Sequence, residues 1–322
     1  MKGKYFLKVY NKRVSFEIEI CRSVTIIRGD SATGKSTFIN MLSDSLAGGE
    51  RGVKLQTDFD RDRITVINAA RQIDDQIALN RRDMLFVADE GINLGSHKAF
   101  VKYLQDSGSY LIYITRKNGT GFLQFAVSEI YTFKNERRDN YTAVKMFRKY
   151  IEKPRVYKPD LIITEDSNSG HDIIEHIVNV PVMTSNGKDN MANKIAELKN
   201  IKSPNIYVLV DCAAFGNCIE KVLRQGVHVN MSESIEYLML GTYVFRKYID
   251  RELTETYNYA ESSEYYTWER YYTYLLQDLC KKYPGCAYDK EGWARLNDTF
   301  KSERFLSDIS AQLTDLDETV KI

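Results

Sequence analysis

The stretch Val24-Thr-Ile-Ile-Arg-Gly-Asp-Ser-Ala-Thr-Gly-Lys-Ser-Thr37 decides the fold of the first half of this chain. Its first five residues, Val24–Arg28, form a short apolar run of the kind found in strands that are buried on both faces. Gly29 to Ser36 then follow the spacing G-x-x-x-x-G-K-S of a phosphate-binding loop. Residues Ser36–Leu46 have helical periodicity, with apolar side chains on one face. A strand, a glycine-containing turn and a helix in this order predict a P-loop within an α/β domain.

The residue types in this loop suit the binding of ATP with Mg²⁺. Backbone N–H groups of the loop and of the following helix point at phosphates, and the two glycines allow a tight turn. Lys35 would neutralise the β- and γ-phosphates, and the Ser36 hydroxyl is a hard oxygen ligand for Mg²⁺. The absence of an Asn-Lys-x-Asp motif favours ATP over GTP. The residues expected to contact the nucleotide are Gly29, Asp30, Ser31, Ala32, Thr33, Gly34, Lys35, Ser36 and Thr37.

Two later strand ends supply the remaining groups of a predicted ATPase site. Met84–Ala88 is a buried strand that ends in Asp89 and Glu90, and ligands bind at the carboxyl ends of such strands. We expect Asp89 to hold Mg²⁺ and Glu90 to orient or deprotonate the attacking water. Arg116 ends the next buried strand, where it would either sense the γ-phosphate or face solvent.

The sequence around the loop predicts two domains. Lys4–Tyr10 and Arg13–Ile20 alternate apolar and polar residues and predict an N-terminal β-hairpin. Strand-like and helix-like segments then alternate, which indicates a mostly parallel sheet with helices on its faces. Pro154 and Pro159 flank a linker-like stretch, so we expect a P-loop domain over 1–154 and a smaller α/β domain over 155–322 with a helical C-terminal extension.

The first half resembles compact ATPases related to the ABC class. The resemblance rests on the loop quoted above, on Asp89-Glu90 and on Tyr113-Ile-Thr-Arg116, and it covers about residues 1–135. Those ATPases carry a β-hairpin before the loop, and many are encoded on mobile elements or in bacterial defence systems. This chain differs from them in its short linker before Asp89, in the lack of a Leu-Ser-Gly-Gly signature, and in Thr115-Arg116 where many relatives have histidine.

The second half places carboxylates after two more strands. Glu165 follows Leu161–Thr164, and Asp211 follows Tyr207–Val210. Glu236 adds a third carboxylate near a helix start. Because neighbouring parallel strands end at one edge of their sheet, these carboxylates could bind one or two Mg²⁺ ions and cut a phosphodiester.

This layout is similar to the Toprim domain of topoisomerases, primases and overcoming-lysogenisation-defect nucleases. The last of these join an ABC-like ATPase to a Toprim nuclease, in the order found here. The resemblance implies that Glu165 matches the first-strand glutamate, Asp211 the first aspartate of the Asp-x-Asp pair, and Glu236 a later acidic position. Ala213 stands where the second aspartate belongs. The alternatives are a non-cutting Toprim relative and an unrelated domain whose strand-end acids cap helices.

Composition is that of a globular protein whose two halves differ in charge. The net charge of +1 hides a basic first half, since residues 1–150 contain 25 Lys and Arg against 17 Asp and Glu. This asymmetry suits phosphates, DNA or RNA. An odd number of scattered cysteines and the lack of a signal peptide or spanning segment favour the cytoplasm, with no membrane partner.

We therefore expect an ATPase that acts on nucleic acid as a nuclease of a defence system or mobile element. A partner protein or a homo-oligomer would fit either reading of the second half. The rival hypotheses are an ATP-switched regulatory or scaffold protein with a non-cutting second domain, and a small-molecule or nucleotide kinase. A nuclease needs Glu165 and Asp211 close enough to share a metal ion. A kinase needs an acceptor pocket beside Lys35.

Overall fold

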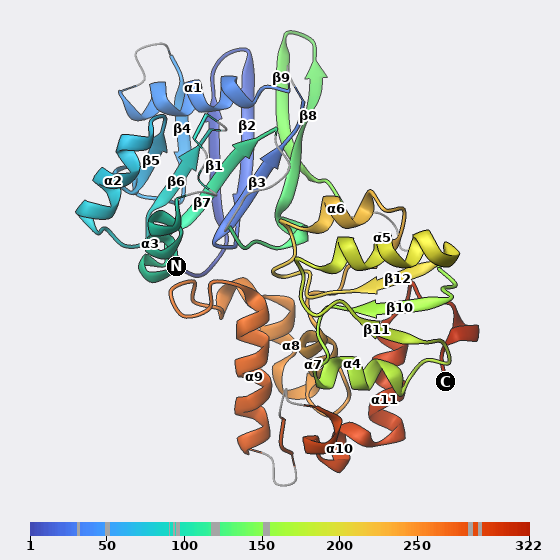
Figure 1. Ribbon diagram of the computed structural model, residues 1–322. Coiled ribbons are helices and arrows are strands. Elements are labelled where there is room, and N and C mark those ends of the chain that lie inside the picture. Colours follow the sequence, from blue (N-terminus) through green and yellow to red (C-terminus); the bar gives the residue numbers. More distant parts are fainter. Residues whose placement is uncertain are drawn as a thin grey trace. The chain divides into compact units, whose positions relative to one another are not determined.

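The chain folds into two compact α/β units, each built around its own sheet (Figure 1). The computed structural model describes residues 1–30, 33–48, 52–89, 91–92, 94, 97–116, 123–150, 155–282, 286–288 and 292–322. The first unit comprises Met1–Tyr150 and Tyr257–Thr267, and the second comprises Ile151–Thr256 and Trp268–Ile322.

The first unit contains a nine-stranded sheet and three main helices among its described residues. Its strand order is β4-β1-β2-β9-β8-β3-β7-β6-β5. Its elements are β1 (Tyr5–Tyr10), β2 (Val14–Ile20), β3 (Val24–Arg28), α1 (Lys35–Leu46), β4 (Lys54–Thr57), β5 (Ile64–Ile67), α2 (Ala70–Leu79), β6 (Leu85–Ala88), α3 (Lys98–Ser107), β7 (Tyr110–Thr115), β8 (Ile130–Arg138) and β9 (Tyr141–Arg148).

The sheet is parallel over one part and mixed over the other. Strands β8, β3, β7, β6 and β5 are mutually parallel, as the alternation of strands and helices predicts. The expected hairpin of β1 and β2 is present, and it joins the same sheet through the parallel pairing of β2 with β9. The mostly parallel sheet of the sequence-based prediction is therefore extended by an antiparallel half.

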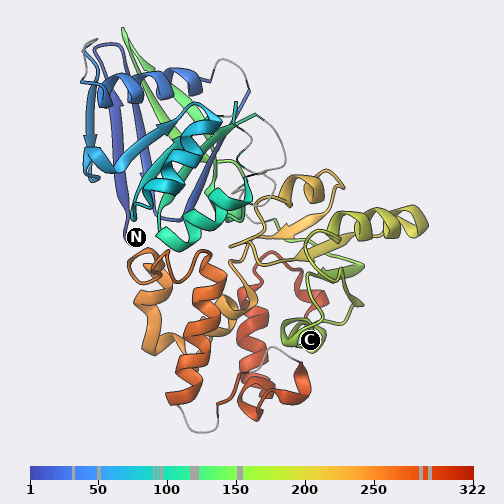
Figure 2. The ribbon, with the colours of Figure 1, turned by 60° about the vertical axis from the view of Figure 1, so that its left-hand side comes forward.

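Chain connectivity forces this sheet to curl. Its two edge strands, β4 and β5, are consecutive in sequence and are joined by residues 58–63. Such a connection spans at most about 25 Å when fully extended, whereas nine flat strands would hold the edges about 38 Å apart. Helix α1 contacts β1, β4 and β5, and it lies across the curled sheet in both views (Figures 1 and 2).

Aromatic packing fixes α1 in this position. Phe38, Met41 and Leu42 are buried, which confirms the apolar face predicted for this helix. The Phe38 ring packs against Phe16 and Phe133, with ring centroids 5.6 and 5.9 Å apart. Buried aromatic side chains contribute large apolar areas to a core, so this cluster ties the loop-bearing helix to strands β2 and β8.

The division of the chain differs from the predicted one at two places. The first boundary falls after Tyr150, whereas the sequence predicts it after residue 154. Tyr257–Thr267, expected in the second domain, belongs to the first unit. The Ser262 hydroxyl donates to the Gly108 carbonyl at 2.6 Å, and the Ser23 hydroxyl donates to the Tyr266 carbonyl at 3.0 Å. These bonds join residues far apart in sequence, so no local pattern indicated them.

The second unit has a four-stranded parallel sheet in the order β11-β10-β12-β13. The chain moves to one side of β10 to form β11 and then returns to the other side for β12, which makes the edge between β10 and β12 a topological switch point. Its elements are β10 (Leu161–Thr164), α4 (Ser169–Glu175), β11 (Val182–Thr184), α5 (Met191–Lys202), β12 (Ile206–Leu209), α6 (Ile219–Leu223), β13 (His228–Asn230), α7 (Ile235–Leu240), α8 (Arg246–Thr254), α9 (Trp268–Lys282), α10 (Asp298–Lys301) and α11 (Glu303–Gln312).

A buried polar network attaches the C-terminal segment to this sheet. Asp315 accepts hydrogen bonds from the Tyr207 hydroxyl at 2.7 Å and from the Asn230 amide at 2.9 Å. Its other oxygen lies 2.7 Å from His228 Nε2, and the His228 ring stacks between Tyr157 and Tyr207. Burial opposes ionisation of Asp315, but these hydrogen bonds outweigh it and lower the pKa of its carboxyl.

Replacement Asp315→Asn should cost about 2 kcal/mol of unfolding free energy at pH 7, because it removes the charged partner of His228 from a buried network. A carboxyl with a lowered folded-state pKa stabilises the protein above its ordinary pKa of 3.8 and loses that effect as the pH falls through the lowered value. The difference in unfolding free energy between the wild type and the variant should therefore become smaller below pH 3.8. Urea unfolding across this range measures it, with the exposed Glu318→Gln as a control that should change little.

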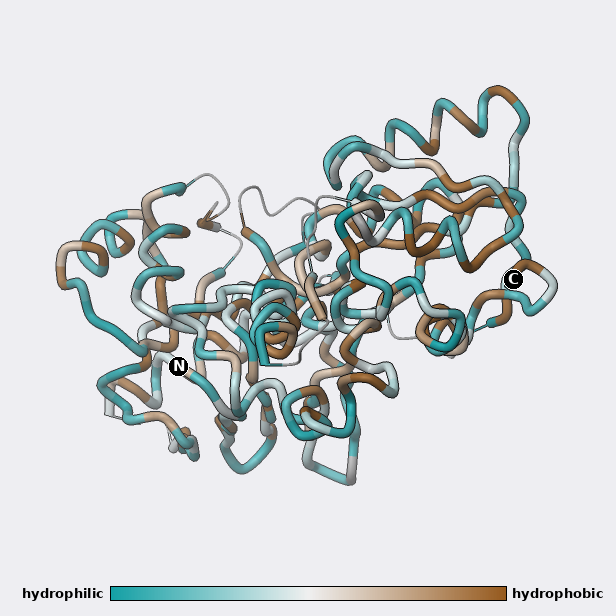
Figure 3. Tube along the Cα trace, turned by 90° about the horizontal axis from the view of Figure 1, so that it is seen from below, coloured by the Kyte–Doolittle hydropathy of each residue, from teal (hydrophilic) through white to brown (hydrophobic). Residues whose placement is uncertain are grey.

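Hydropathy changes sign within short distances along the Cα trace (Figure 3). Within the part of the chain that the structure describes, no helix combines the length and the apolar character needed to cross a membrane.

Candidate functional site

The predicted phosphate loop ends at a glycine whose backbone conformation other residues avoid. Gly34 precedes α1 with φ +89°, and its carbonyl accepts the Phe38 N–H at 2.9 Å. A Cβ at this position would lie 3.2 Å from the Phe16 ring. The left-handed conformation and the close ring both explain why the motif has glycine here.

Lys35 folds back across the loop that it follows. Its side chain is buried, and Nζ donates to the carbonyls of Gly29 at 2.5 Å and Asp30 at 2.6 Å and to the Thr33 hydroxyl at 2.9 Å. The ammonium therefore lies inside the curve of the loop. Ser36 and Thr37, in the first turn of α1, have exposed side chains. The predicted loop residues Ser31 and Ala32 lie outside the described residues.

The strands that carry the predicted catalytic residues, β6 and β7, lie on one side of β3, the strand that precedes the loop. Strand β7 lies between β3 and β6, with Thr115 paired to Arg28 and Tyr113 paired to Ala88. Asp89 follows β6 directly, and its side chain is half-buried. Because β6 is two strands away from β3, the backbone of Asp89 lies about 10 Å from the start of the loop. Arg116 directly follows the intervening strand, β7, and has an exposed side chain. Glu90 lies outside the described residues.

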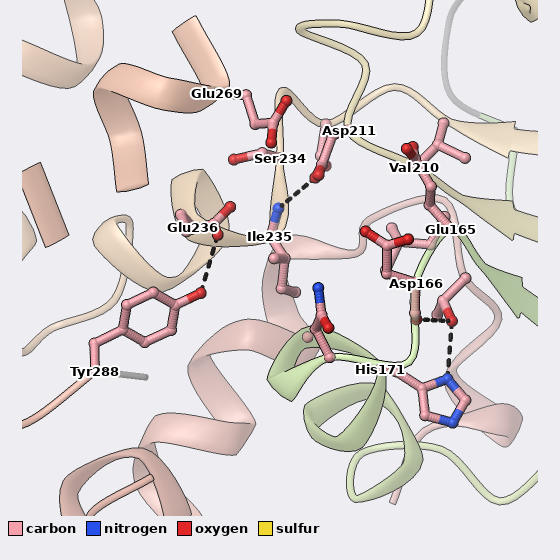
Figure 4. A pocket seen from close by; sticks show the side chains of 15 residues that line it. Glu165, Asp166, His171, Val210, Asp211, Ser234, Ile235, Glu236, Glu269 and Tyr288 are labelled. Carbon is pink, nitrogen blue, oxygen red and sulfur yellow. Dashed lines mark hydrogen bonds between the residues drawn. The ribbon is translucent and has the colours of Figure 1, made fainter. Parts of the chain in front are cut away.

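A second group of predicted residues lines a pocket in the second unit, at the switch point between β10 and β12 (Figure 4). The pocket measures about 600 Å³, including space open to solvent at its mouth. We call it the acidic pocket, because it is lined by the carboxylates of Glu165, Asp166, Asp211, Glu236 and Glu269, together with Thr164, Asn168, Gly170, His171, Leu209, Val210, Ser232, Ser234, Ile235 and Tyr288. The structure thus brings together all three acids that the sequence predicts for this site.

Glu165 is held at the end of β10 by the turn after β11. Its carbonyl accepts the Gly187 N–H at 2.8 Å and the Ser185 hydroxyl at 3.0 Å. Burial of the side chain raises the pKa of its carboxyl to about 7, and the charges of Asp166 and Glu269 act in the same direction. A carboxylate that is costly to ionise where it lies is one that a metal cation would stabilise.

Asp211 and Glu236 are connected through the start of α7. Asp211 Oδ1 accepts the Ile235 N–H at 3.3 Å, so this carboxylate also caps the helix. Glu236 follows one residue later and has only 1% of its surface exposed. The Tyr288 hydroxyl donates to Glu236 Oε1 at 2.9 Å, as the dashed line in Figure 4 shows.

Glu269 is the pocket residue that the sequence did not reveal. It lies in the first turn of α9, in the part of the chain that the sequence predicts as a helical C-terminal extension. Nothing in its local pattern distinguishes it from a surface glutamate, because its role depends on where α9 packs. Ala213, the position at which the Toprim resemblance requires an aspartate, is buried.

A smaller group of possible metal ligands lies beside the pocket. Donor atoms of His171, Asp172 and Glu175 are within 4.8 Å of one another on α4. His171 Nδ1 also lies 2.8 Å from the Thr164 hydroxyl, which orients its ring.

Comparison of the chain with known protein families, with curated proteins and with solved structures finds no match.

Proposed function

We propose that the first unit binds and hydrolyses ATP with Mg²⁺ as a P-loop ATPase. The arrangement that supports this is the loop of Gly29–Gly34, with the Lys35 ammonium inside it and helix α1 starting behind it. The helix N-terminus and the lysine offer two sources of positive charge to one anion. Ser36 and Asp89 would hold Mg²⁺, Glu90 would position water, and Arg116 would contact the γ-phosphate.

We further propose that the second unit is a Toprim-like domain that cuts nucleic acid with divalent metal ions. One observation carries this proposal, namely that carboxylates from four elements meet in the acidic pocket at a switch point. Glu165 follows β10, Asp211 follows β12, Glu236 belongs to α7 and Glu269 to α9. Hard carboxylate oxygens are the ligands that Mg²⁺ and Mn²⁺ prefer.

The acids of this pocket would each have a defined part in the reaction. When bound, the metal ions would supply a polarised phosphate and an activated water. Glu165 would bind a metal ion after losing its proton, since burial holds its pKa at about 7. Glu269 would occupy the position left by the missing aspartate at Ala213. Glu236 accepts a hydrogen bond from Tyr288 through one of its oxygens. It would therefore exchange this hydrogen bond for a metal ion when the ion binds.

Plasmid nicking with Mg²⁺ or Mn²⁺, with and without ATP, tests both proposals. The wild type should nick DNA, Glu165→Ala should not, and Lys35→Ala should lose any dependence on ATP. Matched controls are Glu197→Ala, an exposed acid on α5, and Lys102→Ala, an exposed lysine on α3. Nicking that survives in Glu165→Ala would contradict the metal site. RNA substrates belong in the same assay, because metal-assisted hydrolysis acts on the phosphodiester that DNA and RNA share.

A non-cutting second unit remains the alternative, and one contact favours it. Asp211 caps α7, which is the structural role that a strand-end acid has in an interaction domain. ATP hydrolysis without cleavage of DNA or RNA under any of these conditions would favour an ATP-switched binding protein. Affinity capture with and without ATP would then identify its partner.

A further inference from the structure

The hairpin of β8 and β9 concentrates the positive charge of the first half of the chain. Residues 130–150 contain six Lys and Arg against two Asp and Glu, an excess of four. Residues 1–150 as a whole contain 25 against 17, an excess of eight. Half of this excess therefore lies in one hairpin, and a local concentration of positive charge attracts anionic partners.

The two faces of this hairpin differ in character. Phe133 and Val144 are buried in the core of the first unit. Lys134 and Lys145 are paired directly across the two strands, and because side chains alternate along a strand they lie on the opposite face. Lys134 is exposed, and the Lys145 side chain is 44% exposed. The outer face of the hairpin, as we call it, comprises Thr132, Lys134, Glu136, Ala143, Lys145 and Phe147.

The pairing of Lys134 with Lys145 is unfavourable within the protein itself, because like charges directly opposite one another in a sheet repel. Two surface contacts moderate the repulsion. Lys145 Nζ lies 3.1 Å from Glu136 Oε2, and Lys134 Nζ lies 4.6 Å from the centre of the Phe147 ring. Exposed contacts of these kinds contribute little. A phosphate group bound between the two ammonium groups would turn their repulsion into attraction.

Phe147 adds an accessible aromatic ring to the same face. Its side chain is 37% exposed, and it lies opposite Thr132. Only Ile130 and Tyr131 of β8 pair with β3, so from Thr132 onward the hairpin (green in Figure 1) has no further strand beside β8 among the described residues. The flexible stem of Lys134 lets its ammonium leave the ring for a phosphate. The ring then offers its surface to a base.

We propose that the outer face of the β8–β9 hairpin binds single-stranded DNA, with Lys134 and Lys145 on phosphates and Phe147 stacked on a base. Charge and an exposed ring on one face are the two features of single-strand binding surfaces. The bases of a duplex stack on one another and are closed to such a ring. The choice of DNA over RNA rests on the nicking proposed above. The binding itself needs neither ATP nor a metal ion.

The test is the fluorescence anisotropy of a labelled thymidine oligonucleotide of about 20 nucleotides, long enough for one such surface. It uses the full chain, a chelator, no ATP and a series of salt concentrations. The double variant Lys134→Ala, Lys145→Ala should bind about 20-fold more weakly than the wild type at 0.1 M salt. Its plot of log affinity against log salt should be shallower by about 1.4, since each phosphate contact with a single strand contributes about 0.7.

Further variants separate stacking from charge and binding from catalysis. Phe147→Ala should lower the affinity about tenfold and leave the salt dependence unchanged. The double variant Lys98→Ala, Lys102→Ala removes the same charge from exposed positions on α3 and should bind as the wild type does. Lys35→Ala and Glu165→Ala should also bind normally, so the result does not depend on ATP hydrolysis or cleavage. Urea unfolding establishes that each variant is folded.

Unchanged affinity in Lys134→Ala, Lys145→Ala overturns the proposal, and equal binding of polyglutamate shows a surface for any polyanion, which also overturns it. Tighter binding of a duplex or of the matching RNA overturns the assignment to single-stranded DNA. Competition by ATP would assign the Phe147 ring to the nucleotide instead. That outcome is included because Thr132, opposite Phe147, lies beside the predicted phosphate loop, where a Cβ on Gly29 would be 3.5 Å from its hydroxyl oxygen.

Discussion

Replacement Lys35→Ala should lower ATP turnover by about 10²- to 10³-fold, the loss that follows removal of one preorganised charge-stabilising group. The Lys35 ammonium lies inside the loop on the carbonyls of Gly29 and Asp30. Charge that develops on the γ-phosphate would be stabilised by this cation. Release of inorganic phosphate under saturating Mg²⁺ and ATP measures the effect.

Two further substitutions make this result specific to the loop. Lys102→Ala removes an exposed lysine from α3 of the same unit and should leave turnover unchanged. Gly34→Ala should impair turnover without touching a charge, because its φ of +89° and the Phe16 ring both oppose a Cβ. Turnover by Lys35→Ala within about twofold of the wild type, a difference below 0.5 kcal/mol in barrier, would refute the P-loop assignment.

The predicted phosphate loop has a sequence pattern whose requirements are local. Gly34 needs a left-handed backbone, Lys35 must follow it, and a buried strand must precede both. Each requirement restricts residue type within a few positions. The carboxyl-end positions of Glu165 and Asp211 were predictable for the same reason, since Glu165 directly follows a short apolar strand and Asp211 follows another after one residue.

The curl of the large sheet could not be predicted, because it depends on which strands become edges. Strands β4 and β5 are short, at four residues each. Only the pairing of β2 with β9 places the antiparallel half in the same sheet and turns these neighbours in sequence into opposite edges. Parallel pairings between distant segments leave no local signature beyond strand propensity.

Long-range packing also explains what was missed around the acidic pocket. Glu269 enters the pocket because α9 packs against α7. Tyr288 reaches Glu236 across 52 residues of sequence. Neither side chain occupies a special position in its own segment, so only the tertiary structure identifies them as neighbours of the predicted acids.

Replacement Glu165→Gln should stabilise the metal-free protein by about 3 kcal/mol at pH 8, which follows from a rise in pKa from 4.5 to about 7. Burial and the nearby Asp166 and Glu269 make the ionised carboxylate unfavourable in the folded state. The folded protein therefore holds the Glu165 proton more tightly than the unfolded chain does. Its stability should fall as the pH rises from 4.5 to 7, and a neutral glutamine should remove that loss.

Urea unfolding at pH 4 and pH 8, in the presence of a chelator, measures the prediction. The two proteins should be equally stable at pH 4, where Glu165 is protonated in both states, and should diverge at pH 8. Glu197→Gln on α5 is the matched control, because its side chain is exposed. Equal stability of wild type and Glu165→Gln at pH 8 would show that the folded state does not disfavour the ionised carboxylate of Glu165.

Addition of Mn²⁺ at pH 8 turns the same measurement into a test of function. A cation that binds the folded state stabilises it in proportion to the logarithm of its concentration. The wild type should recover the stability that ionised Glu165 costs it, whereas Glu165→Gln should gain little, since an amide oxygen carries no charge to neutralise. A site that is destabilising when empty and stabilising when filled is expected of carboxylates arranged for a metal ion. A purely structural group of acids would show the pH dependence without the response to Mn²⁺.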